Sequence, residues 1–191
     1  TKAGLPCYLC DPKKPSRPVA ATDKTRIRAS LLRVLITGGT STCALHERGV
    51  FLIGGWVEGA LDLAYCSAKG QTALHHCLFT DRPRFEYAGF LLLSLQDSLL
   101  PGIFAQGAQI KDDVSLRGIT VTGTVVVNGA KIGGQLACEG ACIEDSKDLE
   151  GRPQRALSAQ GLETGQSVFF SGITATGIVD VNGAKIGGQF D

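Results

Sequence analysis

Residues 123–136 read GTVVVNGAKIGGQL, and residues 177–190 read GIVDVNGAKIGGQF. The run VNGAKIGGQ is identical in the two copies, and chance does not produce such a match, so the chain contains internal repeats. A shorter unit lies beneath the long repeat, because the same spacing of four apolar residues recurs eleven residues later. The positions are Val125, Val127, Ala130 and Ile132, and then Leu136, Cys138, Ala141 and Ile143. An eleven-residue module therefore decides the fold.

This module can be followed about twelve times, from Val50 to Ile186. Each copy holds two short alternating stretches with two inward residues apiece, which is the pattern of a short strand. The third inward position is usually small, and neighbours such as Gly129, Gly140 and Gly183 supply turns. One module cannot bury its own apolar residues, whereas stacked coils bury one another's. The sequence therefore predicts a mainly β solenoid with two modules, or about 21–22 residues, per coil.

Composition narrows the function classes. The chain has 191 residues, of which 43% are apolar and 19% charged, and its formal net charge is +1. This length suffices for one core, and the charge is too balanced for a dedicated nucleic-acid binder. The longest apolar run, over residues 89–100, contains polar residues and is too short to cross a bilayer, so we predict no membrane span.

The charge also divides the chain. Residues 1–48 hold nine Lys and Arg against three acidic residues, and residues 49–191 hold ten against fifteen. The two parts therefore carry net charges of about +6 and about −5. We expect them to be different structures.

Three segments follow from these patterns. Residues 1–21 are rich in Pro, carry two Cys and lack an apolar period, so we expect an extended arm. Residues 22–48 contain a predicted capping helix and a connector, with Thr22 as the N-cap and a stop at Gly38. The apolar residues at helical spacing are Ile27, Leu31, Val34 and Leu35. Residues 49–191 form the predicted β-helix, with an inserted charged loop at about 144–155 that is either a contact site or a tolerated insertion.

The repeat quoted above, with RIRASLLR at residues 26–33 ahead of it, resembles a family of uncharacterised bacterial proteins. These are pentapeptide-repeat-like, right-handed quadrilateral β-helices built on G-x-V-x-L-x-G-A-x-I-G-G repeats. The resemblance covers roughly residues 26–191 and implies a right-handed, four-sided β-helix with an N-terminal capping α-helix. Members of this group look like scaffolds. A DNA-mimicking member would need a strongly acidic rod, which a net charge of about −5 does not supply.

The cysteines carry one chemical hypothesis. Cys7-x-x-Cys10 and Cys43-x-x-His46 have the ligand types and local spacing of a structural zinc site, which would tie the arm to the start of the solenoid. In the alternative interpretation, His46 forms a hydrogen bond within a loop. Seven cysteines without an evident disulfide framework or an export signal favour a reducing compartment, so we expect a cytoplasmic protein.

No catalytic motif is recognisable elsewhere. His75 follows an inward residue and should point outward, and His76 should lie at a corner, so both are interpreted as exposed turn residues. Ser and His form no recognisable nucleophile pattern, and the Gly129-AKIGG run lacks the Gly-Lys-Ser/Thr that cradles phosphates.

The sequence therefore predicts a non-catalytic solenoid scaffold that binds a protein partner. The alternative is a zinc-tied module or an enzyme centred on the cluster of Cys and His near the N-terminus. The chain stops one residue after Phe190, inside a module, and contains no Met, so we expect either a fragment truncated at its C-terminus or a sequence from which methionines are missing. If the end is natural, a second copy should cover its unpaired edge and give an end-to-end homodimer; if it is not, further coils follow.

Overall fold

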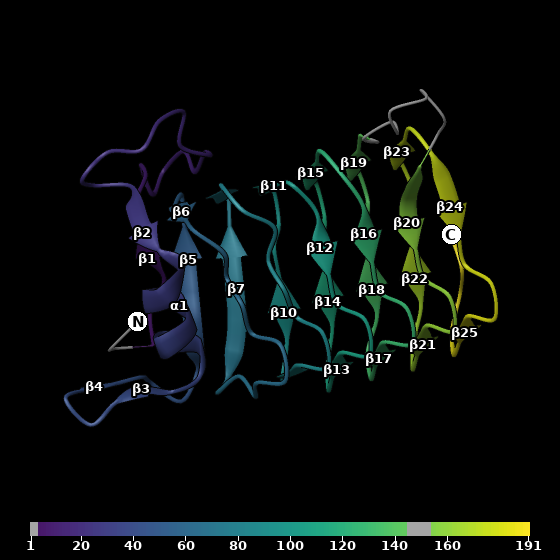
Figure 1. The fold of residues 1–191 in the computed structure, drawn as a ribbon, viewed down its shortest axis with the longest axis horizontal. Coiled ribbons are helices and arrows are strands. Elements are labelled where there is room, and N and C mark those ends of the chain that lie inside the picture. The colour runs from purple at the N-terminus through teal and green to yellow at the C-terminus, as the bar shows by residue number, and fades with distance from the viewer. Residues whose placement is uncertain (1–3, 145–153) are drawn as a thin grey trace.

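The chain forms a rod of stacked coils in the computed structural model, which describes residues 4–144 and 154–191 without the side chain of Cys43 (Figure 1). Strands of successive coils pair in parallel and build four sheets, which we number 1 to 4 in the order in which a coil visits them. The prediction of a mainly β solenoid is confirmed. The predicted loop at about 144–155 falls largely on residues 145–153, which lie outside the described residues.

Among the described residues, sheets 1 and 2 contain seven strands each, whereas sheets 3 and 4 contain four and five, because the first coils contribute only isolated bridges there. Sheet 1 contains β1 (Cys7–Tyr8), β5 (Gly49–Ile53), β7 (Gln71–His75), β10 (Leu93–Ser94), β14 (Val114–Ser115), β18 (Leu136–Ala137) and β22 (Val168–Phe169). Sheet 2 contains β2 (Arg26–Arg28), β6 (Trp56–Glu58), β8 (Leu78–Phe79), β11 (Leu99–Leu100), β15 (Thr120–Val121), β19 (Cys142–Ile143) and β23 (Thr174–Ala175). Sheet 3 contains β12 (Ile103–Phe104), β16 (Val125–Val126), β20 (Arg155–Ser158) and β24 (Ile178–Asp180). Sheet 4 contains β9 (Gly89–Phe90), β13 (Gln109–Ile110), β17 (Lys131–Ile132), β21 (Glu163–Thr164) and β25 (Lys185–Ile186).

The register of the sheets gives the length of a coil. Leu93 pairs with Thr72 in the coil before it and with Val114 in the coil after it, and Val114 pairs in turn with Leu136. The step along the chain is longer between Leu136 and its partner Val168, because it crosses the segment that the structure does not describe. From β5 onward and outside that segment, the predicted coil length agrees with the pairing.

Nearly all the predicted inward positions are buried in one continuous core. The exceptions are Cys66 and Ala68 in the first coil and the inward residues after Val168 in the last, which are half-buried or exposed. The buried side chains are mostly branched aliphatic or small, because facing strands of a narrow coil leave little room. Ile178, Val179 and Phe190 are exposed on the last coil, and the end-to-end dimer stays a prediction.

Two corners of each coil share one backbone conformation. Corner 1 joins sheets 1 and 2, and corner 2 joins sheets 3 and 4. The corner residues all have φ between +50° and +78°. They are Gly54, His76, Asp97, Gly118, Gly140 and Gly172 at corner 1, and Tyr65, Tyr87, Gly107, Gly129, Gly161 and Gly183 at corner 2. Each amide donates a hydrogen bond to the next coil wherever a further coil follows, at 2.8–3.0 Å, so the corners stack like the strands.

The helix is shorter than predicted. Residues 26–28 form β2, which pairs with β6, so α1 spans only Ala29–Ile36. Thr22 does not cap the helix, because its hydroxyl lies 2.8 Å from that of Thr25 and the N-cap is Arg28. The predicted apolar face was also wrong in part: Leu31 and Val34 are exposed, and the buried residues are Ala29, Leu32 and Ile36. Pairing of β2 with the first complete coil fixes where the helix can begin, and it overrides the capping signal.

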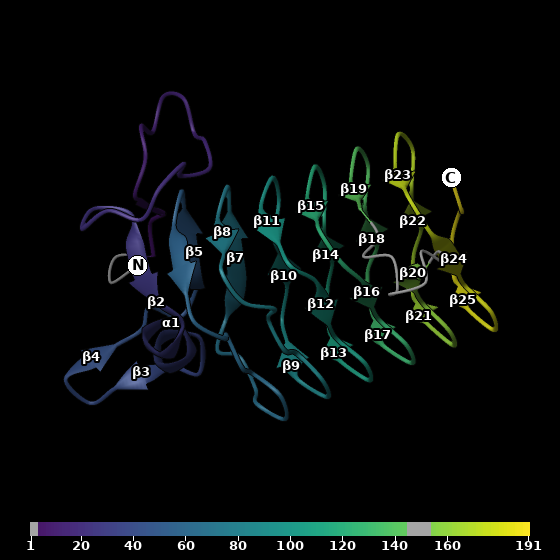
Figure 2. The same cartoon turned by 45° about the horizontal axis from the view of Figure 1, so that its top comes forward.

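The N-terminal end of the rod is covered by α1 and the arm (Figure 2). A short antiparallel pair, β3 (Gly39–Thr40) with β4 (Cys43–Ala44), lies beside the helix. The arm contributes β1, which pairs with β5 at the edge of sheet 1. Within the described residues, no helix is long and apolar enough to cross a membrane.

Candidate interaction surface

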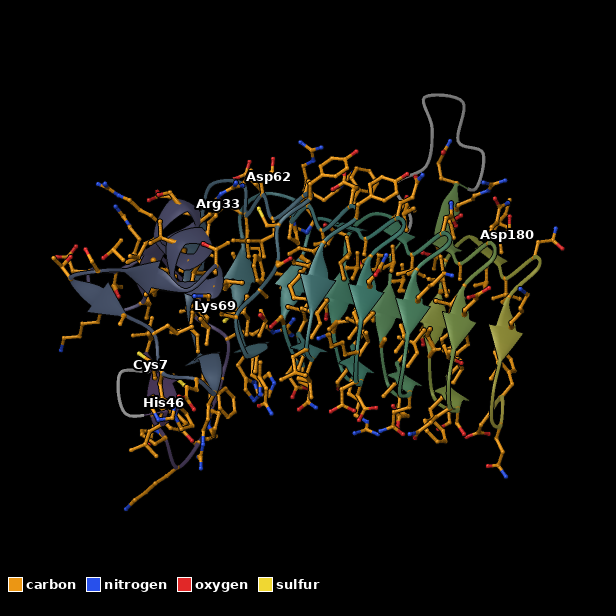
Figure 3. The ribbon with its side chains drawn as sticks, turned by 90° about the horizontal axis from the view of Figure 1, so that it is seen from below. Cys7, Arg33, His46, Asp62, Lys69 and Asp180 are labelled. Carbon is orange, nitrogen blue, oxygen red and sulfur yellow. The ribbon has the colours of Figure 1, made fainter. Side chains whose placement is uncertain are left out.

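The four predicted zinc ligands all belong to the N-terminal end of the chain, where Figure 3 labels Cys7 and His46. Cys7 lies in β1 opposite Leu52 and packs against the core. Cys10 lies against Gly54, with its Sγ 3.9 Å from the carbonyl oxygen of Ile53. Nδ1 of His46 accepts a hydrogen bond from the amide of Arg48 at 3.2 Å, which fits the alternative role in a loop.

The zinc site is not assembled by the residues that the structure describes. Among them, no group of three or more His, Cys, Asp or Glu side chains is placed to hold a metal ion. The side chain of Cys43, the fourth predicted ligand, is not described. Zinc binding therefore stays a prediction, and metal analysis of the protein with and without Cys7→Ser and Cys10→Ser tests it.

The early coils differ from the later ones in the residues at their corners. From Gly107 onward, every described corner position is Gly, the residue for which a positive φ has no steric cost. The four earlier positions after Gly54 are Tyr65, His76, Tyr87 and Asp97. A non-Gly residue in this conformation costs about 1–2 kcal/mol. The early coils therefore keep side chains at positions where the same fold does better without them.

The two tyrosines at corner 2 form a stacked pair, which we call the tyrosine ridge. Their ring centroids are 5.2 Å apart and the rings are inclined by 16°. The ring of Tyr87 also lies over Gly107, where a Cβ atom would come within 2.5 Å of it. Tyr65 is nevertheless 77% exposed and Tyr87 50% exposed. Stacking therefore orders the rings while leaving much of both in contact with water.

Charged side chains flank the ridge. Arg84 forms ion pairs with Asp62 and with Glu86, each at 3.2 Å. The backbone links this triad to the ridge, because the amide of Tyr65 donates to the carbonyl of Glu86 at 2.9 Å. The second carboxylate oxygen of Glu86 is buried and has no hydrogen-bond partner among the described residues. Arg33 of α1 also donates to the backbone carbonyl of Asp62. The ridge thus combines exposed aromatic surface with a neighbouring group of carboxylates and guanidiniums.

A second polar cluster lies on the outer face of sheet 1. His76 lies at corner 1 as predicted, whereas His75 is a half-buried residue of β7 and not an exposed turn residue. Nε2 of His75 is 2.7 Å from Oγ of Ser94, and its ring packs edge-on against Phe51 with centroids 5.0 Å apart. Burial, together with the neighbouring His76, lowers the pKa of His75 to about 4, so the ring is neutral at neutral pH. No described carboxylate pairs with this imidazole, so the contact is interpreted as structural.

Sequence reasoning missed both clusters. His75 and Ser94 are 19 residues apart and meet only because they lie on paired strands of adjacent coils. The stacked tyrosines are separated by one coil step along the chain. Aligning the modules at their coil spacing would have placed Tyr65 above Tyr87, which is the signal that could have found the ridge.

Comparisons with known proteins find no matching family model, no matching curated protein and no matching solved structure.

Proposed function

We propose that this protein is a non-catalytic solenoid scaffold that binds a protein partner through the tyrosine ridge. The observation that carries the proposal is that Tyr65 and Tyr87 stay exposed in a conformation that the later coils reserve for Gly. Tyr is enriched where proteins bind one another, because it offers a large ring surface with few rotatable bonds and a hydroxyl at its tip. The cost of the corner conformation is then offset by binding.

We also infer that the coils form a right-handed helix with four sides, as in the pentapeptide-repeat-like family that the repeats resemble. The four parallel sheets and the regular pairing of strands one coil apart support this shape. A rod of this kind holds its outer side chains at fixed spacing, because every corner amide is bonded to the next coil where one follows. The stacked rings are therefore preorganised for a partner.

Site-specific photocrosslinking tests the binding function. A photoreactive phenylalanine analogue is placed at position 65 of the whole protein, which is mixed with an extract of the cells that produce it. The matched control carries the analogue at position 76, which has the same backbone conformation on the opposite corner. We expect a discrete protein adduct from position 65 alone, competed by unlabelled protein but not by Tyr65→Gly/Tyr87→Gly. The absence of an adduct, or identical adducts from both positions, would overturn the proposal.

A further inference from the structure

The arm carries a short proline motif that the scaffold proposal does not use. Residues 14–18 read KPSRP, with Pro15 and Pro18 three positions apart and cationic residues around them. Each Pro fixes its own φ and pushes the residue before it, Lys14 or Arg17, toward extended or polyproline II geometry. Residues 15–18 have no helical or strand pairing, and their neighbours Lys13 and Val19 are exposed. The motif is therefore biased toward the left-handed, three-residue period of polyproline II.

This segment projects from the body of the rod, in the loop at the upper left of Figure 1. Both of its ends are anchored, because β1 pairs with β5 and β2 pairs with β6. Between them the loop encloses a hollow of about 360 Å³ against Gly54. Val19 is 100% exposed, and Arg17 donates a hydrogen bond across to Oγ1 of Thr120 on the rod at 3.1 Å. The arm thus presents apolar and cationic groups to solvent from a tethered loop.

We propose that the Pro15–Pro18 segment docks on the tyrosine ridge of a second copy of this chain. The inference rests on the proposed function, since it uses the same ridge. Polyproline II segments are recognised by exposed aromatic side chains, because the proline rings pack on aromatic faces and little conformational entropy is lost. Tyr65, which is stacked on Tyr87 and is 77% exposed, supplies such a face.

Charge favours the same occupant. Lys13, Lys14 and Arg17 surround the prolines, and the part of the chain before residue 49 carries about +6. The ridge is flanked by Asp62 and Glu86, which are ion-paired with Arg84, and residues 49–191 as a whole carry about −5. A cation from the arm would also give the buried oxygen of Glu86 a donor once that side chain turns toward it. The single hydrogen bond of Arg17 to Thr120 is exposed and is easily exchanged.

The arm does not lie on its own ridge. The loop lies beside Gly54 at corner 1, whereas the ridge is at corner 2, with sheets 2 and 3 between them along each coil. Docking in this arrangement joins two molecules. One such contact leaves a free ridge on one molecule and a free arm on the other, which either pair with each other in a closed dimer or bind further copies head-to-tail.

Sedimentation velocity over a wide concentration range tests the proposal on the whole chain. We expect the average mass to rise steadily with concentration, and the association constant to fall roughly tenfold or more in Pro15→Ala/Pro18→Ala and in Tyr65→Gly/Tyr87→Gly. The matched control, His76→Gly/Asp97→Gly, replaces corner residues of the same conformation at corner 1 and should associate as the unchanged protein does. A synthetic peptide of residues 11–20 should inhibit association, and the same peptide with both of Pro15 and Pro18 replaced by Ala should not.

Several outcomes would overturn the inference. A protein that is monomeric at every concentration would do so, as would association that survives both the arm and the ridge variants. If Phe190→Ser alone abolished association, the contact would be end-to-end and the arm would have no part in it. The photocrosslinking result is independent of these outcomes: an adduct of another protein at position 65 would support the ridge as an interaction surface even if the arm did not bind it.

Discussion

The coils before residue 101 and those after it share one architecture but differ at their corners. Both sets bury most of their inward positions, apart from Cys66, Ala68 and those after Val168, and both repeat the same corner hydrogen bond. In the early coils the corners after Gly54 carry Tyr, His and Asp, whereas every described corner from Gly107 onward is Gly. The near-identical copies at residues 123–136 and 177–190 lie in the second set. The later repeats show that Gly at each corner is sufficient for this fold. The Tyr, His and Asp residues at the early corners therefore indicate a requirement other than folding.

The largest expected effect tests whether the two regions have equivalent cores. Leu74 in the early coils and Leu136 in the later ones are both almost fully buried, so each replacement by Ala should cost about 2–5 kcal/mol through lost burial and a residual cavity. Denaturation in urea measures both. If one variant loses less than about 1 kcal/mol, the cores are not equivalent and the comparison of corners loses its basis.

The next effect isolates the corner conformation. A Cβ atom at Gly129 would meet nothing within 4 Å, so Gly129→Ala introduces backbone strain without a clash. We expect the free energy of unfolding to fall by about 1–2 kcal/mol. An unchanged denaturation midpoint would show that this fold holds the conformation at no cost, and the argument from Tyr65 and Tyr87 would fail.

The early coils should also be sensitive to acid. The folded pKa of His75, about 4, lies below the ordinary value of 6.5, so between these values the unfolded chain binds more protons and stability falls as pH falls. Because the side chain is partly exposed, we expect a loss of about 1–2 kcal/mol from pH 7 to pH 4. Hydrogen exchange should locate the loss around β7 and β10. His75→Gln serves as the control, and a loss of the same size in that variant would assign the effect to other groups.

The smallest expected effect concerns the stability of the ridge itself. Tyr65→Gly and Tyr87→Gly relieve backbone strain but lose the stacking contact, and these terms are of similar size and opposite sign. Each variant should therefore stay within about 1 kcal/mol of the unchanged protein in urea denaturation. A loss above about 3 kcal/mol would mean that the tyrosines serve folding, and binding would no longer be needed to explain them.

The repeating part of this fold could be predicted from the sequence. The inward residues from Val50 to Val168 could be predicted because a short module repeats many times and each repeat reinforces the same period. The start of α1 could not, because Thr22 offers a good local cap while the pairing of Arg26–Arg28 with β6 is a long-range contact. The ridge was missed for a different reason: Tyr is not a turn residue, so Tyr65 and Tyr87 give no local signal of their conformation.

The long pairing step after Leu136 has a consequence for how such a rod can change over time. Leu136 faces Val168, and Val125 faces Leu157, with the inward rows as continuous as they are at shorter steps. An insertion between two strands thus leaves the later strands with the same side chains pointing inward and outward. Position along the rod is counted in coils and not in residues. A segment can therefore lengthen, shorten or be exchanged at that place while every surface group elsewhere keeps its position on the rod.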